Sequence, residues 1–307
     1  MGENKTNIMA LEMDEDSFFS SEVESFWMRV WRRFRNHKLA MFGTLIIVFI
    51  ISCSILAPVI SPFPYDELHL EDIKYGKPLA PNSKYWFGTD NLGRDYLTRC
   101  IYGGRVSLIV AFGAVVISLC IGVPLGCLAG YYGGVVDMII CRIIEILTCI
   151  PTFFLILTVN AMFKPSIFNV MICLGVLGWM GIARQIRAQF LSLRNQDFVQ
   201  SAIALGIKDS EVIFRHLLPN ALMPVVVNAT MRVASNIMME SALSYLGLGV
   251  QEPTPSWGAM LKVSQSYIKD APWMALFPGI LISVIALALN FAGDGLRDAL
   301  DPRTLEK

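Results

Sequence analysis

The stretch SAIALGIKDSEVIFRHLLPN, residues 201–220, lies between two long apolar runs of the chain. It has a glycine in its middle, charged residues in its second half and a proline near its end. It is too polar to span a membrane and more apolar than a solvent-facing turn requires. The segment therefore needs an explanation of its own, and its local signals supply the first part of one.

A short helix is predicted just before the glycine. Asp197 followed by Gln200 is the capping-box arrangement, and it predicts a helix over 198–205, about 13 Å long at 1.5 Å per residue. We expect this helix to end at Gly206, because a left-handed residue after a helix costs little only for glycine.

A second helix follows the glycine. Asp209 or Ser210 can cap it, and it runs towards Pro219, which predicts an elbow into the next apolar run.

The first helix is too short to be stable alone in water. Its apolar residues are Phe198, Val199, Ala202 and Leu205. Two interpretations stay open at this point. The helix packs on its own bundle or in the headgroup layer, or it is held out for a cytoplasmic partner.

The composition is that of a membrane protein. Of the 307 residues, 54% are hydrophobic and only 16% are charged, and the mean hydropathy is +0.54. The formal net charge is zero, which gives no support for binding nucleic acid. Membrane lipids are the expected surroundings.

Six apolar runs are long enough to cross a bilayer, which takes about 20 residues. They predict an all-α polytopic membrane protein with six transmembrane helices. The runs are 39–60, 106–136, 146–163 with an extension back to 138, 165–183, 217–246 and 271–293.

Lysine and arginine set the expected orientation. The predicted inner segments hold fourteen of them and the short outer segments three, so both termini are expected in the cytoplasm. The predicted parts are a cytoplasmic tail with a basic cluster (1–38), a first transmembrane helix (39–60), an extracytoplasmic loop (61–105), a core of five transmembrane helices (106–295) and a cytoplasmic tail (296–307).

No motif of an enzyme or a metal site is found. The only Gly-Lys pair, Gly76-Lys77, is followed by Pro78 and lacks the upstream glycine of a nucleotide-binding loop. HExxH, GxSxG and paired cysteine and histidine ligands are absent from the sequence. We expect no catalytic residue, no metal ligand and no cofactor bound by this chain.

Several stretches resemble one transporter family. FVQSAIALGIKDSEVIFRHLLPN (198–220) resembles the cytoplasmic coupling loop of permeases in ATP-binding cassette (ABC) importers. Others resemble the C-type permease subunit of dipeptide, oligopeptide and nickel importers, and the similarity covers about residues 26–303. These are NHKLAMFG (36–43), FGTDNLGRDYLTRCIYGGRVSL (87–108), ESALSYLGLGVQEPTPSWG (240–258), APWMALFPG (271–279) and GDGLRDALDPR (293–303).

The resemblance implies the type I importer fold and a role as half of a translocation path for dipeptides or oligopeptides, working by alternating access. Nickel chelates or glutathione are alternative cargoes. It implies a homologous second permease, two ATPase subunits that bind ATP and magnesium, an extracytoplasmic solute-binding protein, and a bacterial or archaeal plasma membrane. The coupling loop would be 195–217, with ATPase-coupling residues Phe198, Gln200, Ser201, Ala202, Leu205, Gly206 and Asp209.

The chain departs from the family at the start of this loop. Gln200, Ser201 and Ile203 stand where the family usually has Glu, Ala and Arg. We therefore expect shape and apolar packing around Gly206 to contribute more to an ATPase contact than charge does.

Polar residues inside the spans are the candidates for the path. A central Arg costs about 2.5–3.5 kcal/mol on insertion scales, and Arg232 lies near the middle of the fifth span. Glu240 lies about 12 Å further along the helix axis, too far to pair with it. Two interpretations stay open. Arg232, Asn236, Glu240 and Asn290 line the path or face the partner permease, or the charges pair with Asn160, Asn228 or Asn290 to fix the bundle.

Arg142 and Glu145 are expected to form an ion pair on one helix face, with a substrate site as the alternative. Asp90, Arg94 and Asp95 are expected to pack the outer loop, with contact to an external solute receptor as the alternative.

A secondary transporter or channel without ATPases is the alternative from another class. It predicts inverted repeats and a coupling-ion site near the bilayer midplane, and the sequence shows neither a repeat nor a carboxylate cluster there.

Overall fold

The computed structural model describes residues 26–71, 73, 77–163 and 165–300. The predictions that fall on 1–25, Lys164 and 301–307 lie outside them. The described residues form helices and no strand, apart from an isolated bridge between Thr89 and Asp95. The helices are α2 (Phe26–Asn36), α3 (Lys38–Ile55), α4 (Ala57–Ile60), α5 (Tyr96–Tyr132), α6 (Gly134–Thr148), α7 (Thr152–Met162), α8 (Ile167–Leu193), α9 (Asp197–Ala204), α10 (Asp209–Glu211), a π-helical turn (Val212–Leu217), α11 (Leu218–Tyr245), α12 (Trp257–Ser264), a 3-10 turn (Gln265–Tyr267) and α13 (Trp273–Leu300).

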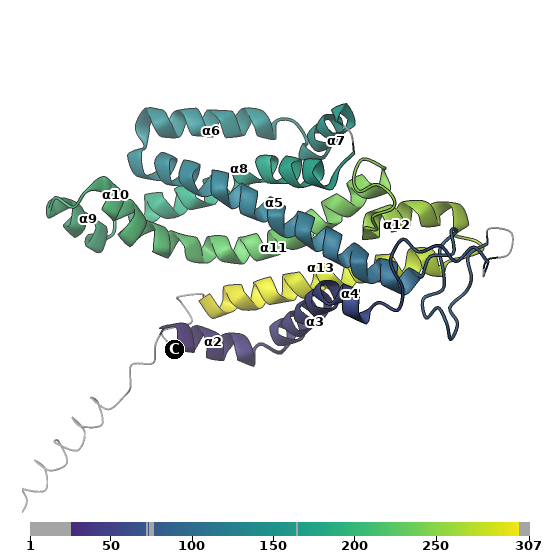
Figure 1. Cartoon of the computed structure of the whole chain (residues 1–307). Helices are drawn as coiled ribbons and strands as arrows, with labels where there is room; N and C mark the ends of the chain where they lie inside the picture. Colours follow the sequence, from purple (N-terminus) through teal and green to yellow (C-terminus); the bar gives the residue numbers. More distant parts are fainter. Residues whose placement is uncertain (1–25, 72, 74–76, 164, 301–307) are drawn as a thin grey trace, which may run out of the picture.

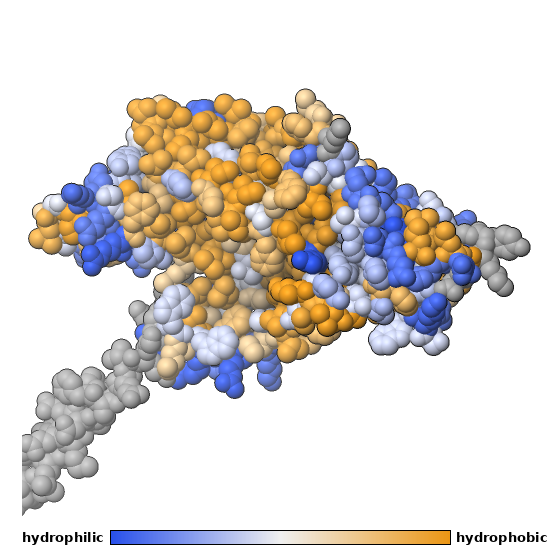
Figure 2. Space-filling view, in the orientation of Figure 1, coloured by the Kyte–Doolittle hydropathy of each residue, from blue (hydrophilic) through white to orange (hydrophobic). Residues whose placement is uncertain are grey.

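In the described part of the chain, five helical stretches are long and apolar enough to cross a membrane, and the count rises to six if the bent pair α6 and α7 forms one span. The all-α, multi-span prediction is confirmed. α5, α8 and α11 lie in the centre of the bundle, with α6 and α7 on one side and α13 and α3 on the other (Figure 1). Figure 2 shows a hydrophobic band along the bundle between two more hydrophilic ends.

The third span is not the single helix that the apolar run suggested. α6 and α7 meet at an angle of 79°. The break includes Pro151, whose backbone is extended in ψ (φ −56°, ψ 119°). Proline offers no N–H to a preceding turn and disfavours helical geometry in the residue before it. The run 146–163 therefore divides into two segments.

Three helices extend beyond their apolar runs. α5 begins at Tyr96 rather than Val106, so the preceding loop ends ten residues earlier than expected, while α8 reaches Leu193 and α13 reaches Leu300. Asp95 caps α5, since its Oδ2 accepts the Thr98 N–H at 2.8 Å. The first turns of α5 contain Arg99, which is charged yet 3% exposed. An apolar-run count misses such turns.

Small residues bring α5 and α8 into close contact. A Cβ atom added to Gly126 would lie 2.7 Å from the carbonyl oxygen of Ala183, and one on Gly122 would lie 2.8 Å from that of Trp179. Gly122 and Gly126 are four residues apart on one face of α5, the spacing that lets membrane helices approach backbone to backbone. This contact forms the centre of the bundle.

An ion-pair network fixes the end of the bundle near α12. Arg94 Nε lies 2.6 Å from Asp90 Oδ2, and Arg94 Nη1 lies 2.7 Å from Glu252 Oε2. Arg99 Nη2 donates to Glu252 Oε1 at 3.2 Å. The interpretation of Asp90, Arg94 and Asp95 as packing residues is confirmed, because all three are 2–3% exposed.

Candidate functional site

The predicted short helix exists as α9, at the end of the bundle opposite α12 (Figure 1). The predicted capping residue is wrong by one position. Gln196 is the N-cap, with an extended backbone and no side-chain cap bond, and Asp197 is the first helical residue. The Asp197 carboxylate in the first turn is still favourable next to the helix dipole.

The corner after α9 is built as the sequence predicted. Gly206 has a φ of +74°. The Gly206 N–H donates to the Ile203 carbonyl at 2.9 Å, and the Ile207 N–H donates to the Ala202 carbonyl at 3.2 Å. These two bonds and the left-handed glycine are the Schellman arrangement that ends a helix.

One face of α9 is part of the chain's own core. Val199 is 0% exposed and Ala202 is 5% exposed. They pack in a cluster with Phe190 of α8 and with Val212 and Leu217 of the π-helical turn. Ala202 is therefore a support for α9 and is not open to a partner. The interpretation that the helix packs on its own bundle holds for this face.

The other face of α9 is open. Phe198 is 45% exposed, Ile203 43% and Leu205 81%, and Ser201 is also exposed. The exposed Gln200 donates from Nε2 to the Arg194 carbonyl at 2.9 Å, which ties α9 to the end of α8. Figure 2 shows hydrophobic atoms at this tip of the molecule beside hydrophilic ones. The described part of the chain therefore leaves this apolar face of α9 uncovered.

Tyr131 at the end of α5 holds the segment in place. Its hydroxyl donates to Asp209 Oδ1 at 2.8 Å, and its carbonyl accepts from Arg194 Nη1 at 3.0 Å. Asp209 thus lies in the first turn of α10 and bonds to α5; Lys208 is the N-cap of α10, where Asp209 or Ser210 was expected.

The elbow at Pro219 is absent. The chain stays helical from Asp209 to Tyr245. A π-helical turn, Val212–Leu217, directly precedes Pro219. A π turn pairs residues five apart, and such a wide turn accommodates the missing proline N–H without a break. α10 is therefore continuous with α11, and the corner at Gly206 connects this long helix to α9.

The polar residues of the fifth span divide into two groups. Arg232 and Asn236 line one cavity of about 230 Å³, and Arg232 and Asn290 line a second of about 370 Å³. Glu240 is separate and 0% exposed. Its carboxylate accepts from Ser107 Oγ at 2.8 Å and from Ser244 Oγ at 2.7 Å, so it is fixed inside the bundle.

The pairing of Arg232 with asparagines is not found. Within the described part of the chain, Asn228 and Asn290 share a cavity with Arg232 but form no hydrogen bond with it. Asn160 donates to the carbonyl of Ile156 in its own helix at 2.9 Å.

Two features of α8 were missed from the sequence. Arg184 lines the same cavity as Arg232. Arg187 forms a two-bond ion pair with Asp137 of α6: its Nε donates to Oδ1 and its Nη2 to Oδ2. Both arginines follow the run 165–183 and were assigned to a loop. The predicted pair of Arg142 and Glu145 does form, at 2.8 Å, with both side chains more than half exposed.

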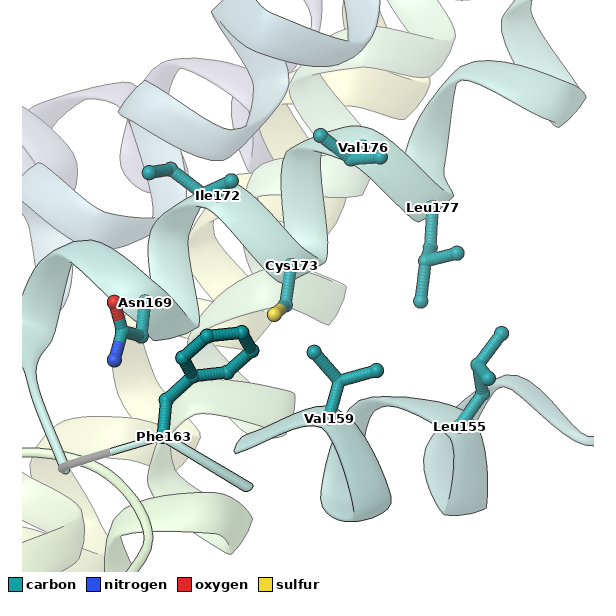
Figure 3. A pocket seen from close by; sticks show the side chains of 8 residues that line it. All are labelled: Leu155, Val159, Phe163, Asn169, Ile172, Cys173, Val176 and Leu177. Atoms are coloured by element: carbon teal, nitrogen blue, oxygen red, sulfur yellow. The ribbon is translucent and has the colours of Figure 1, made fainter. Parts of the chain in front are cut away.

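A further cavity of about 350 Å³ lies between α7 and α8. Figure 3 shows its lining, which is Leu155, Val159, Phe163, Asn169, Ile172, Cys173, Val176 and Leu177. Among the described residues that line this cavity, Asn169 supplies the one amide and none carries a charge.

Comparison with known proteins identifies the family. Residues 122–306 match the family described as binding-protein-dependent transport system inner membrane component. Residues 25–81 match the N-terminal transmembrane domain of oligopeptide transport permease C.

Three relatives are similar over most of their length. The dipeptide transport system permease protein DppC of Alkalihalophilus pseudofirmus is 41% identical over 90% of both chains. The oligopeptide transport system permease protein OppC of Haemophilus influenzae is 38% identical over 98% of this chain and 96% of its own. The glutathione transport system permease protein GsiD of Escherichia coli is 39% identical over 92% of both.

The fold also has a solved counterpart. The inward-facing methionine ABC transporter MetNI aligns with a TM-score of 0.56 and 19% identity, over 67% of this chain and 98% of the other. This likeness supports the fold alone. The family match and the relatives show that the chain is a multi-pass membrane protein and a transport subunit rather than an enzyme. It belongs to the binding-protein-dependent transport system inner membrane components, the permease subunits of ABC importers.

Proposed function

We propose that this chain forms half of the translocation path of an ATP-driven importer of dipeptides or oligopeptides. A homologous second permease would supply the other half. Two ATPase subunits would bind ATP and magnesium, and an extracytoplasmic binding protein would deliver the peptide. The names of the 38–41% identical relatives support the cargo, and the family match supports the kinds of partner.

The observation that carries the proposal is the two-sided burial of α9. Val199 and Ala202 anchor the helix in the core, while Phe198, Ile203 and Leu205 form an apolar face outside it. An exposed apolar face on a firmly anchored element is typical of a protein interface. Gln200 and Ser201 add hydrogen-bonding groups and no charge, so the contact would depend on shape.

The connections of α9 explain how ATPase motion would reach the path. Asp209 is bonded to Tyr131 of α5, Gln200 to the end of α8, and the π-helical turn continues into α11. Closure of the ATPases would displace three spans together and rotate this half of the path. Because ATP shifts the equilibrium only through differential affinity, α9 must fit the ATPases better in one state than in the other.

The test is co-purification of the ATPase subunits with the permease complex. Leu205→Glu places a charge on the most exposed apolar side chain of α9. We expect the affinity for the ATPases to fall about tenfold or more, since truncating an apolar anchor commonly costs about 2 kcal/mol.

The matched control is Ile268→Glu. Ile268 is 55% exposed and follows the 3-10 turn after α12, at the other end of the molecule. It should retain wild-type ATPase binding. Equal binding by the Leu205 and Ile268 variants would remove α9 from the ATPase contact.

The proposed location is a bacterial or archaeal plasma membrane with both termini and α9 in the cytoplasm. The excess of lysine and arginine in the segments on the α9 side supports this orientation. A reporter fused after residue 307 should be active only in its cytoplasmic form.

Glutathione is a second candidate cargo, because GsiD is 39% identical over 92% of this chain. Mass spectrometry of the ligand retained by the co-purified binding protein distinguishes a dipeptide or oligopeptide from glutathione.

A further inference from the structure

Two arginines line one open cavity beside α8 and α11. Arg184 of α8 and Arg232 of α11 both line the cavity of about 230 Å³, together with the polar Ser235 and Asn236. No Asp or Glu is among its lining residues, all of which lie in the described part of the chain. The Arg184 side chain is exposed and the Arg232 side chain is partly buried. Like charges that line one cavity repel each other, and an anion bound between them offsets that repulsion.

The arginines have no partner among the residues that the structure describes. Neither Arg184 nor Arg232 forms a hydrogen bond or an ion pair there. Two acidic residues of the helices are engaged elsewhere, Glu240 with Ser107 and Ser244 and Asp137 with Arg187. A guanidinium has five N–H donors and no acceptor, so each group is left able to bind an anion.

Two glycines of α8 make room for the Arg232 guanidinium. A Cβ atom on Gly181 would lie 2.6 Å from Arg232 Nη2, and one on Gly178 would lie 3.2 Å from Nη1. Any larger residue at 181 would displace the guanidinium. The absence of side chains at these positions thus determines where the positive charge lies.

The cavity belongs to a series along α8 and α11. It shares Gly181, Arg232 and Ser235 with the cavity of about 370 Å³, which adds Gln185, Asn228 and Asn290.

Gln185 and Asn228 also line a third cavity, of about 550 Å³, which ends at Gln189, Asn220 and Arg297. Figure 2 shows the surface hollowed between α11 and the end of α13, where this third cavity lies. Among the described residues, the charged side chains that line the three cavities are all arginines.

We infer that Arg232 and Arg184 bind the carboxylate of a peptide in transit, through charge-assisted hydrogen bonds from the guanidinium groups. This inference rests on the proposed peptide import. Dipeptides and longer peptides share few groups beyond the backbone, and the C-terminal carboxylate is one of them. Arginine donates to a carboxylate with two parallel N–H bonds, which suits a site that must accept many side chains and one constant group.

Occupancy of the cavity is the measurement that tests this site. Ser235 is exposed and lines the first two cavities, so Ser235→Cys reports on them. The rate of thiol labelling is measured in the purified complex with its second permease and ATPases, relative to the parent chain. Dialanine at millimolar concentration should slow the labelling, and dialanine amide, which lacks the carboxylate, should not.

Variants assign the effect to the guanidinium. Arg232→Gln in the reporter chain should weaken protection by dialanine about tenfold, as expected for the loss of a charge-assisted hydrogen bond. Gly181→Ala should weaken it similarly, because it moves the guanidinium without removing the charge. The control is Arg142→Gln, which removes an arginine that is 71% exposed on α6 and should retain full protection.

Four results would overturn the inference. Equal protection by dialanine and its amide would mean that the site does not bind the carboxylate. Protection that survives Arg232→Gln would mean that Arg232 does not bind it. Loss of the second permease from the Arg232→Gln complex would assign the arginine to pairing with a partner carboxylate. Slowing by phosphatidylglycerol in place of peptide would assign the site to lipid headgroups.

Failure of the proposed function would give a different experimental result from failure of the carboxylate site. If the wild-type complex does not retain ATPases or import any peptide, the importer proposal fails whatever the labelling shows. If import and ATPase binding are intact and only the protection pattern is absent, the carboxylate site alone is wrong.

Discussion

Gly206 is a residue whose backbone, rather than its contacts, defines its role. Its φ is +74°, and no heavy atom lies within 4 Å of the position that a Cβ would take. A substitution here therefore changes backbone energy without creating a clash. The corner between α9 and α10 depends on that one left-handed position.

Gly206→Ala is expected to weaken ATPase binding about tenfold, because a left-handed non-glycine residue costs about 1–2 kcal/mol. Gly206→Asn is the control, since asparagine adopts this conformation more readily. The dissociation constant of the ATPases checks the order glycine, asparagine, alanine. Equal affinity for the alanine and asparagine variants would contradict the backbone argument.

Glu252 gives the end of the bundle near α12 a pH-dependent stability. Partial burial acts to raise the pKa of Glu252, but the hydrogen bond from Arg94 and the charges of Arg99 and Arg94 outweigh it and hold the pKa below its usual value. A depressed carboxyl pKa contributes stability above the unfolded pKa of about 4.3, and this stability is lost as the pH falls through the folded pKa.

The melting temperature of wild type should therefore exceed that of Glu252→Gln at neutral pH, and the difference should shrink as the pH falls below about 4.3. The effect is small and salt-sensitive, because the Glu252 side chain is 44% exposed. A difference that stays constant from pH 7 to pH 3.5 would contradict this account.

At the residue scale, the sequence predicted the features that depend only on neighbouring residues in the chain. Gly206 and the two-helix corner follow from chain-neighbour rules and are confirmed. Ala202 was predicted as a contact residue and is buried, because which helical face turns inward depends on Phe190 and Leu217, distant in the sequence. Arg184 was missed, because an apolar run ends at the first charge while a helix does not.

At the scale of elements, the α5–α8 contact should be the most sensitive to added volume. Gly126→Val is expected to destabilise the bundle by about 1–3 kcal/mol, since overpacking forces the helices apart. A Cβ there meets Ala183 O and Ile186 Cβ, both at 2.7 Å.

Gly279→Val is the matched control, because Gly279 also lies inside a long helix and has no heavy atom within 4 Å of its Cβ position. The intrinsic helix penalty of valine is then common to both variants and cancels. Thermal unfolding in detergent should show a lower midpoint for the Gly126 variant only. Matching midpoints would contradict the close-contact argument.

The ends of α5, α6 and α7 show that hydropathy alone does not predict where a helix begins or breaks. The signal for the α6–α7 break was present as Pro151 in the run 146–163, but a count of apolar residues carries no backbone geometry. The early start of α5 at Tyr96 depends on Arg99 being neutralised by Glu252, a partner 153 positions away in the chain. No local rule finds such a partner.

At the scale of the whole molecule, the helices that line the arginine cavities are the ones connected to α9. α8 supplies Arg184 and ends shortly before α9 in the chain. α11 supplies Arg232 and begins directly after the π-helical turn that follows α9 and α10. A displacement of α9 by the ATPases would therefore move both sides of the cavity series. This arrangement links energy input to the place where a peptide carboxylate would be bound.

The measurement that tests this account most directly is peptide uptake into proteoliposomes that contain the chain, its second permease and its ATPases, with loaded binding protein outside. Uptake should require ATP hydrolysis and should fall with Leu205→Glu in proportion to the ATPases lost. Uptake that continues without ATPases, driven by an ion gradient, would contradict the account and favour a secondary transporter.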